Sequence, residues 1–193
     1  MKIRLAIGLA ATLLLAACGS QSSHSNTNAT VVENSASATG FNDADVMFAQ
    51  MMIPHHEQAI EMSDMALDPT TQASKEIIDL ATQIKAAQDP EIKQMKDLLT
   101  VWAQPLIADA DMDHGSMMDG MLSMDYMDKL GALKGPEFDY FWAQSMIAHH
   151  EGAIDMAEVV LDDGSNAEAL ALANAIVSAQ ATEIDLLKAI PKP

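Results

Sequence analysis

The hydrophobic positions of this 193-residue chain fall into two long stretches with helical spacing. From Asp45 to Ala66, apolar residues recur at alternating steps of three and four, and the stretch from Asp139 to Val160 repeats the pattern. This spacing lines one face of an α-helix with apolar side chains. Each long stretch is followed by a shorter one of the same period, at residues 80–98 and 172–187. The pattern therefore predicts four helices.

The two halves of this pattern are copies of each other. Residues 45–67 and 139–161 are identical at 12 of 23 positions without a gap, and residues 80–95 align with 172–187. Turn signals at Pro69 and Gly164 separate the helices of each copy, which predicts two helical hairpins. We expect an all-α, antiparallel four-helix bundle in one domain, residues 43–190, with hairpins at 43–102 and 136–190 and a crossover connector at 103–135.

Two prolines fall inside predicted helices. Proline removes a backbone donor and clashes with the preceding turn. We therefore expect a kink at Pro54, which has Ala148 as its counterpart in the second copy, and a kink or a restart at Pro90.

The first residues have the pattern of an export signal. Lys2 and Arg4 precede a short apolar run, so we assign residues 1–17 to a signal peptide. The run ends in a Leu-Ala-Ala-Cys-Gly sequence that resembles a bacterial lipobox, which implies cleavage before Cys18 and its lipidation. Ordinary secretion with a chance cysteine is the alternative. The Ser- and Asn-rich residues 18–42 predict a flexible tether.

Charge and cysteine content exclude several classes of protein. The formal net charge is −18, which excludes a nucleic-acid binder that works through a basic face. A single cysteine excludes a disulfide framework and a cysteine-ligated zinc or iron–sulfur site.

Histidine and methionine carry the candidate chemistry. Each copy has a histidine pair, with one methionine three or four residues before it and another about two turns after it. These candidate ligands are Met52, His55, His56 and Met62 in the first copy, and Met146, His149, His150 and Met156 in the second. Imidazole and thioether donors together favour Cu(I), or Ag(I) as its mimic. The alternative is that the methionines fill gaps in the core and the histidines make buried hydrogen bonds.

The connector is also rich in methionine. Its candidate ligands are Met112, His114, Met117, Met118, Met121, Met124 and Met127. The last four methionines recur every third residue, so a short helix or turn could align them. Because aspartate and glycine are interspersed, the sequence favours a flexible segment that captures a soft metal over a core stripe.

Further polar residues recur at equivalent positions of the two copies. Gln88 with Glu91, and Gln180 with Glu183, could hydrogen-bond the histidine pairs across each hairpin. Asp45 and Asp139 begin the long helices, where they could serve as N-terminal charges, caps or ligands.

Enzyme motifs are missing from the sequence. Neither copy has the Glu-x-x-His of a ferritin-type di-iron site or the His-Glu-x-x-His of a zinc protease. We therefore expect a protein that is not an enzyme.

The repeated motif resembles that of the domain of unknown function 305 family. The resemblance is carried by Asp45, the histidine pair with its following glutamate, Met62 and the Gln88-x-x-Glu91 segment, and by their second copies. It covers residues 41–190. It implies a ferritin-like four-helix bundle, and some members of the family are exported copper-binding proteins linked to copper tolerance.

Together these features predict an exported protein that binds Cu(I), with Ag(I) or Cu(II) as alternatives, for copper buffering, transfer or tolerance in the cell envelope. Its expected partners are the metal ion, a membrane reached through the lipid anchor and an envelope copper-handling protein. Two alternatives are a ferritin-like metalloenzyme that handles oxygen or peroxide and a metal-free structural bundle.

Overall fold

The computed structural model describes residues 40–107 and 119–193, and the regular structure in these residues is helical. In chain order the elements are α1 (Asp43–Leu67), the 3-10 turn η1 (Pro69–Thr71), α2 (Lys75–Val101), α3 (Met124–Ala132), α4 (Gly135–Asp163) and α5 (Ala167–Leu187). The predicted signal peptide, Cys18 and nearly all of the tether lie outside the described residues, as do Met112, His114, Met117 and Met118.

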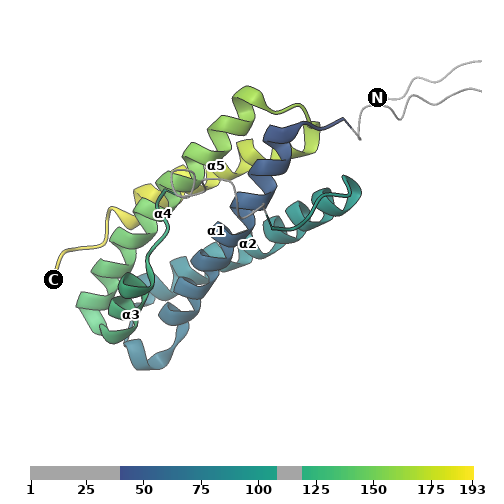
Figure 1. Ribbon diagram of the computed structural model, residues 1–193. Helices are drawn as coiled ribbons and strands as arrows, with labels where there is room; N and C mark the ends of the chain where they lie inside the picture. The colour runs from purple at the N-terminus through teal and green to yellow at the C-terminus, as the bar shows by residue number, and fades with distance from the viewer. Residues whose placement is uncertain (1–39, 108–118) are drawn as a thin grey trace, which may run out of the picture. The chain divides into compact units, whose positions relative to one another are not determined.

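The predicted helical bundle is confirmed. Helices α1 and α2 form one hairpin, α4 and α5 form the other, and α1 packs against α4 between them (Figure 1). The short helix α3 lies at the end of the connector and contacts α4; the methionine spacing allowed a short helix or turn in this segment. Helix α5 has the length and mean hydropathy (1.2) of a membrane-spanning helix, but its buried residues belong to the bundle core.

The prolines do not interrupt their helices. Helix α1 runs through Pro54 and α2 through Pro90, so the predicted restart at Pro90 is wrong. Ala86, four residues before Pro90, lies on the exposed side of α2. Water can therefore satisfy the Ala86 carbonyl that proline leaves without its helical partner.

Asp45 and Asp139 join the two hairpins at their turns. The carboxylate of Asp45 on α1 accepts hydrogen bonds from the backbone N–H groups of Ser165 and Asn166, at the start of α5. The carboxylate of Asp139 on α4 accepts from the backbone N–H of Ser74, the residue that caps α2. Of the roles left open for these two aspartates, the structure shows that of a backbone cap, made to the opposite hairpin.

The hydrophobic core consists of two clusters separated along the bundle. One cluster includes Phe48 of α1 and Val160 of α4, and the other includes Ala66 of α1 and Phe138 of α4. Because the early part of α1 shares a cluster with the late part of α4, these helices run antiparallel. The residues between the clusters are polar.

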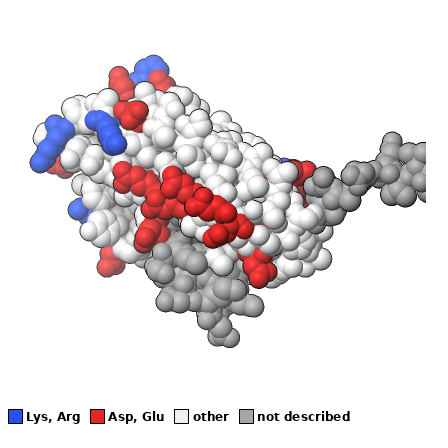
Figure 2. Space-filling model, turned by 90° about the horizontal axis from the view of Figure 1, so that it is seen from above, with Lys and Arg blue, Asp and Glu red and all other residues white. Residues whose placement is uncertain are grey.

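The outer surface is strongly acidic on one side. Figure 2 shows Asp and Glu side chains gathered in a band across the face in view, with most of the visible Lys side chains toward one end. A surface of this charge raises the local concentration of cations.

Candidate metal centre

A layer of polar side chains separates the two hydrophobic clusters, and we call it the histidine layer. It contains a histidine pair from each long helix and a glutamine and a glutamate from each shorter one: His55, His56, Gln88, Glu91, His149, His150, Gln180 and Glu183. All four imidazoles have no exposed surface. Helical spacing puts each pair at the same level of the bundle as the polar residues of α2 and α5.

His55 of α1 and His149 of α4 meet at the contact between the hairpins. Their ring centroids are 3.8 Å apart, and the ring planes are tilted by 42°. The structure therefore brings one imidazole from each sequence repeat into direct contact, although the two residues are 94 positions apart in the chain.

His56 and His150 each face a glutamate of their own hairpin. Nε2 of His56 lies 2.9 Å from Oε2 of Glu91, and Nε2 of His150 lies 2.7 Å from Oε2 of Glu183. A carboxylate accepts hydrogen bonds, so in both residues Nε2 carries the proton. When the imidazole is neutral, this leaves the lone pair on Nδ1.

Several nitrogen and oxygen atoms of this layer lack a hydrogen-bond partner among the described residues. They include Nδ1 of all four histidines and Nε2 of His149. Both side-chain amide atoms of Gln88 and Oε1 of Gln180 are also unpaired. Of the predicted partners of the histidines, Glu91 and Glu183 are the ones that bond them in the structure. Unpaired buried polar atoms are costly, and coordination of an ion is one way to satisfy them.

Burial keeps the central imidazoles neutral. Removal from water lowers the pKa of His55 from 6.5 to about 3, although the backbone carbonyl of Asp119 partly opposes this shift. Burial, reinforced by His55, holds the pKa of His149 well below its usual value. Neutral imidazole is the form that binds a metal.

The predicted methionine ligands divide into two groups. Met52 and Met146 are fully buried, one helical turn before their histidine pairs. Met62 and Met156 stand seven residues after His55 and His149, which separates them by roughly 10 Å along the helix axis. Met62 packs in the hydrophobic cluster that also contains Met146, and Met156 lines a surface groove.

The end of the connector is fixed over the histidine layer. The carbonyl oxygen of Asp119 lies 3.3 Å from Nε2 of His55. The side chain of Gln58 donates to the carbonyl of Leu122 at 2.9 Å and accepts from its N–H at 2.8 Å. These bonds attach the connector to α1.

Glycine allows the same segment to lie against α4. A Cβ built on Gly152 would stand 1.7 Å from the carbonyl oxygen of Asp119, and a Cβ on Gly120 would stand 2.3 Å from that of Ala148. Gly152 aligns with Gln58 in the sequence repeat. The sequence analysis identified neither Gln58 nor Gly152 as functional. The available signal was the difference between glutamine and glycine at this aligned position, which identical residues flank in both copies.

The methionines at the described end of the connector do not form one row. Met121 is half-buried before α3, Met124 is 84% exposed, and Met127 is buried in the core with Leu130. The three-residue spacing was predicted to align them. Because an α-helix turns by 3.6 residues, and because Met121 precedes α3, they point in different directions.

The donor chemistry fits a soft monovalent ion. Within residues 40–107 and 119–193, no three His, Cys, Asp or Glu side chains converge as a metal site. The available donors are instead imidazole nitrogens and buried thioethers, from His55, His56, His149, His150, Met52 and Met146. Imidazole and thioether suit Cu(I), whereas Ca²⁺ and Mg²⁺ require several oxygen ligands.

Solved structures with the same fold come from several proteins. A DUF305 protein from Streptomyces coelicolor is 33% identical, with a TM-score of 0.69 over 75% of this chain and 89% of that one. A DUF305 fragment from Deinococcus radiodurans is 30% identical, with a TM-score of 0.68 over 76% and 94%. CopM in its Cu(I)-bound form is 32% identical, with a TM-score of 0.61 over 75% and 92%.

CopM has also been solved with Cu(II) and with silver bound, at 31% and 30% identity to this chain. Among curated proteins, none matches the sequence. The model of the family described as "Domain of unknown function (DUF305)" matches residues 45–190. With its duplicated hairpins and its two histidine pairs, the chain belongs to the DUF305 family.

Proposed function

We propose that this protein binds copper, as Cu(I), in the histidine layer, and that it serves copper buffering, transfer or tolerance in the cell envelope. The observation that carries the proposal is the set of unpaired Nδ1 atoms on four fully buried imidazoles. The relationship to CopM, which is known in Cu(I)-, Cu(II)- and silver-bound forms, supports the choice of metal.

The hydrogen bonds of the layer prepare the imidazoles for a metal. Glu91 and Glu183 accept the Nε2 proton of His56 and His150, and the carbonyl of Asp119 is placed to accept that of His55. All three bonds select the tautomer whose lone pair is on Nδ1. Partners of this kind fix the ring orientation and raise the basicity of the ligand atom. A soft ion would be held by Nδ1 donors.

Two thioethers complete the proposed donor set. Met52 and Met146 stand one turn from the imidazoles and are fully buried. Thioether sulfur binds soft cations without losing a proton, so no thiol is needed in an oxidising compartment. We retain Met112, His114, Met117 and Met118 as proposed capture ligands on sequence grounds alone.

The proposed location is outside the cytoplasm. The basic and apolar pattern of residues 1–17 and the lipobox-like segment at Cys18 support export followed by lipid anchoring. The Streptomyces coelicolor relative carries a name that places it among secreted proteins. We propose an envelope copper-handling protein as the partner for metal transfer. We also propose that the four long helices have the arrangement of a ferritin-like bundle.

Metal analysis of defined variants tests the proposal. Wild-type protein and a His55→Leu/His56→Leu/His149→Leu/His150→Leu variant are loaded with Cu(I) under reducing, anaerobic conditions, dialysed against a Cu(I) chelator and assayed for bound copper. A variant with His24→Leu in the tether is the matched control. The four-histidine variant is expected to lose its tightest copper, and the control to keep it.

The same experiment separates the alternatives. Equal stoichiometry and affinity in all three proteins would refute the assignment of the histidine layer. Absence of bound metal in the wild type, together with strong destabilisation of the four-histidine variant, would favour a structural bundle. Turnover of oxygen or peroxide by the metal-loaded wild type would favour an enzyme.

A further inference from the structure

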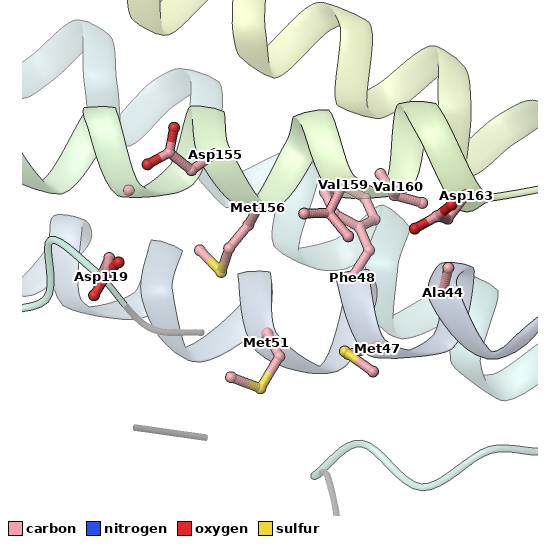
Figure 3. A pocket seen from close by; sticks show the side chains of 11 residues that line it. Ala44, Met47, Phe48, Met51, Asp119, Asp155, Met156, Val159, Val160 and Asp163 are labelled. Carbon is pink, nitrogen blue, oxygen red and sulfur yellow. The ribbon is translucent and has the colours of Figure 1, made fainter. Parts of the chain in front are cut away.

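A surface groove runs between α1 and α4 beside the histidine layer, with a cavity of about 350 Å³. Figure 3 shows the helices on either side and the side chains that line the groove. At one end the groove reaches Asp119 and Gly152, the residues at which the connector meets α4, and at the other it reaches Ala44 and Asp163. None of the four histidines lines it.

Three thioethers enter this groove from two helices. Met47 and Met51 are four residues apart, so they stand one above the other on α1, and Met156 enters from α4. Figure 3 shows Met156 reaching from α4 toward α1, and Met47 and Met51 along α1. Met51 is 4% exposed, and the other two are half-buried. Met47 and Met51 belong to neither core cluster.

The remaining lining gives the groove a defined chemical character. Phe48, Val159 and Val160 provide apolar walls, and the carboxylates of Asp119, Asp155 and Asp163 stand among the lining residues. Among the described residues that line the groove, none is basic. Carboxylates attract a cation toward the groove, and thioethers then favour a soft one over a hard one.

We propose that this groove is a second, solvent-accessible site for a soft monovalent cation, Cu(I) or Ag(I), with Met47, Met51 and Met156 as its three sulfur ligands. The inference rests on the proposed function for the kind of cation but uses none of the histidines. Asp119 lines one end of the groove, and its carbonyl contacts His55. That end of the groove therefore adjoins the part of the connector that covers the buried layer.

Methionine methyl signals provide a direct test. Protein labelled with ¹³C at the methionine methyl groups is titrated with Ag(I), and the signals are assigned through single Met→Leu variants. Met and Leu are similar in volume, so these substitutions preserve packing. We expect the methyl signals of Met47, Met51 and Met156 to shift together and to saturate at the same added equivalent. This measurement on the wild type does not depend on the folding of a multiple variant.

Two further proteins separate this site from the histidine layer. The Met47→Leu/Met51→Leu/Met156→Leu variant is expected to bind one Ag(I) fewer than the wild type. Met65→Leu, a half-buried methionine of α1 outside the groove, is expected to lose none. In the His55→Leu/His149→Leu variant, the three methyl signals should still shift.

The outcomes are distinct. If Ag(I) binds but leaves the three methyl signals unchanged, or if the triple variant keeps its full stoichiometry, the groove site is refuted while the histidine-layer proposal stands. Loss of the three shifts in the histidine variant would refute an independent groove site. Absence of any Ag(I) binding in the wild type would overturn both proposals.

Discussion

Acidification should destabilise the metal-free protein through His55. Burial lowers the pKa of this residue to about 3 in the folded protein, against 6.5 for an ordinary histidine. The unfolded chain therefore takes up a proton between these pH values, and the folded protein does not. Stability is highest above pH 6.5 and falls as the pH drops toward about 3.

The two pKa values give the size of the effect. Each pKa unit between the unfolded and folded values corresponds to about 1.4 kcal/mol. His55 should therefore lower the free energy of unfolding at pH 5 by about 2 kcal/mol relative to neutral pH. The pKa of His149 is shifted in the same direction, also by burial first, so it adds to the loss. Domains are stable by only about 5–15 kcal/mol, so a change of this size is easily measured.

The assay must separate His55 from the carboxylates. The chain has a net charge of −18, and protonation of its surface acids relieves repulsion and acts in the opposite direction. Urea unfolding of metal-free wild type and of His55→Leu, followed by far-ultraviolet circular dichroism between about pH 7.5 and 5, provides the comparison. Leucine removes the titrating group and leaves the carboxylates unchanged.

The expected result is a difference in pH dependence between the two proteins. Acidification to pH 5 should cost the wild type about 2 kcal/mol more than it costs His55→Leu. If the two unfolding free energies follow parallel curves across this range, His55 does not remain neutral because of burial. The account of the imidazoles as neutral ligands would then lose its basis.

Three other substitutions test separate features. Gly152→Ala should lower the free energy of unfolding by about 1–3 kcal/mol, because the added Cβ would meet the carbonyl of Asp119. Gly131→Ala is the control, since Gly131 has open space around it, and it should leave stability unchanged or raise it. Thermal unfolding of the two variants measures the difference. Glu91→Leu should weaken Cu(I) binding about 10–100-fold in a chelator competition, because it removes the partner that orients an imidazole. Asp45→Ala should cost about 1–2 kcal/mol in urea unfolding, because the start of α5 loses its carboxylate acceptor.

Each of these expectations has a contrary result. Equal melting temperatures for the two glycine variants would show that the connector does not pack tightly on α4. Unchanged Cu(I) affinity in Glu91→Leu would separate that glutamate from the metal. An unchanged free energy of unfolding in Asp45→Ala would mean that water satisfies the backbone N–H groups at the start of α5.

The helices were predictable because their determinants are local. The alternating three- and four-residue spacing from Asp45 and from Asp139 marks one buried face, and that face is what the structure packs. The effect of Pro90 was misjudged because it depends on a tertiary feature. The carbonyl that proline leaves unpaired lies on the exposed side of α2, which periodicity alone did not weigh.

The arrangement of the site depended on contacts across the repeat. Spacing could place His55 and His149 on equivalent faces, but their 3.8 Å contact follows from how the hairpins pack. Spacing suggested a glutamine and a glutamate of each shorter helix as hydrogen-bond partners of the histidines. In the structure the glutamates make the bonds, and spacing alone could not distinguish them from the glutamines.

The connector was the hardest segment to predict. Met121, Met124 and Met127 share a spacing but not an environment, because α3 begins only at Met124 and Met127 enters the core. The attachment through Gln58 and Gly152 depends on contacts between distant segments, and its one trace in the sequence is the difference between the copies at that aligned position. A difference between two copies can mark the place where a third segment binds.

The exchanged aspartate caps have a consequence for folding. Because Asp45 satisfies the start of α5 and Asp139 satisfies the start of α2, each hairpin contains a turn that is completed by the other. Neither hairpin is fully hydrogen-bonded when it stands alone. The two copies should therefore melt in one cooperative transition rather than in sequence, and a single hairpin expressed alone should find these acceptors only by pairing with a second copy of itself.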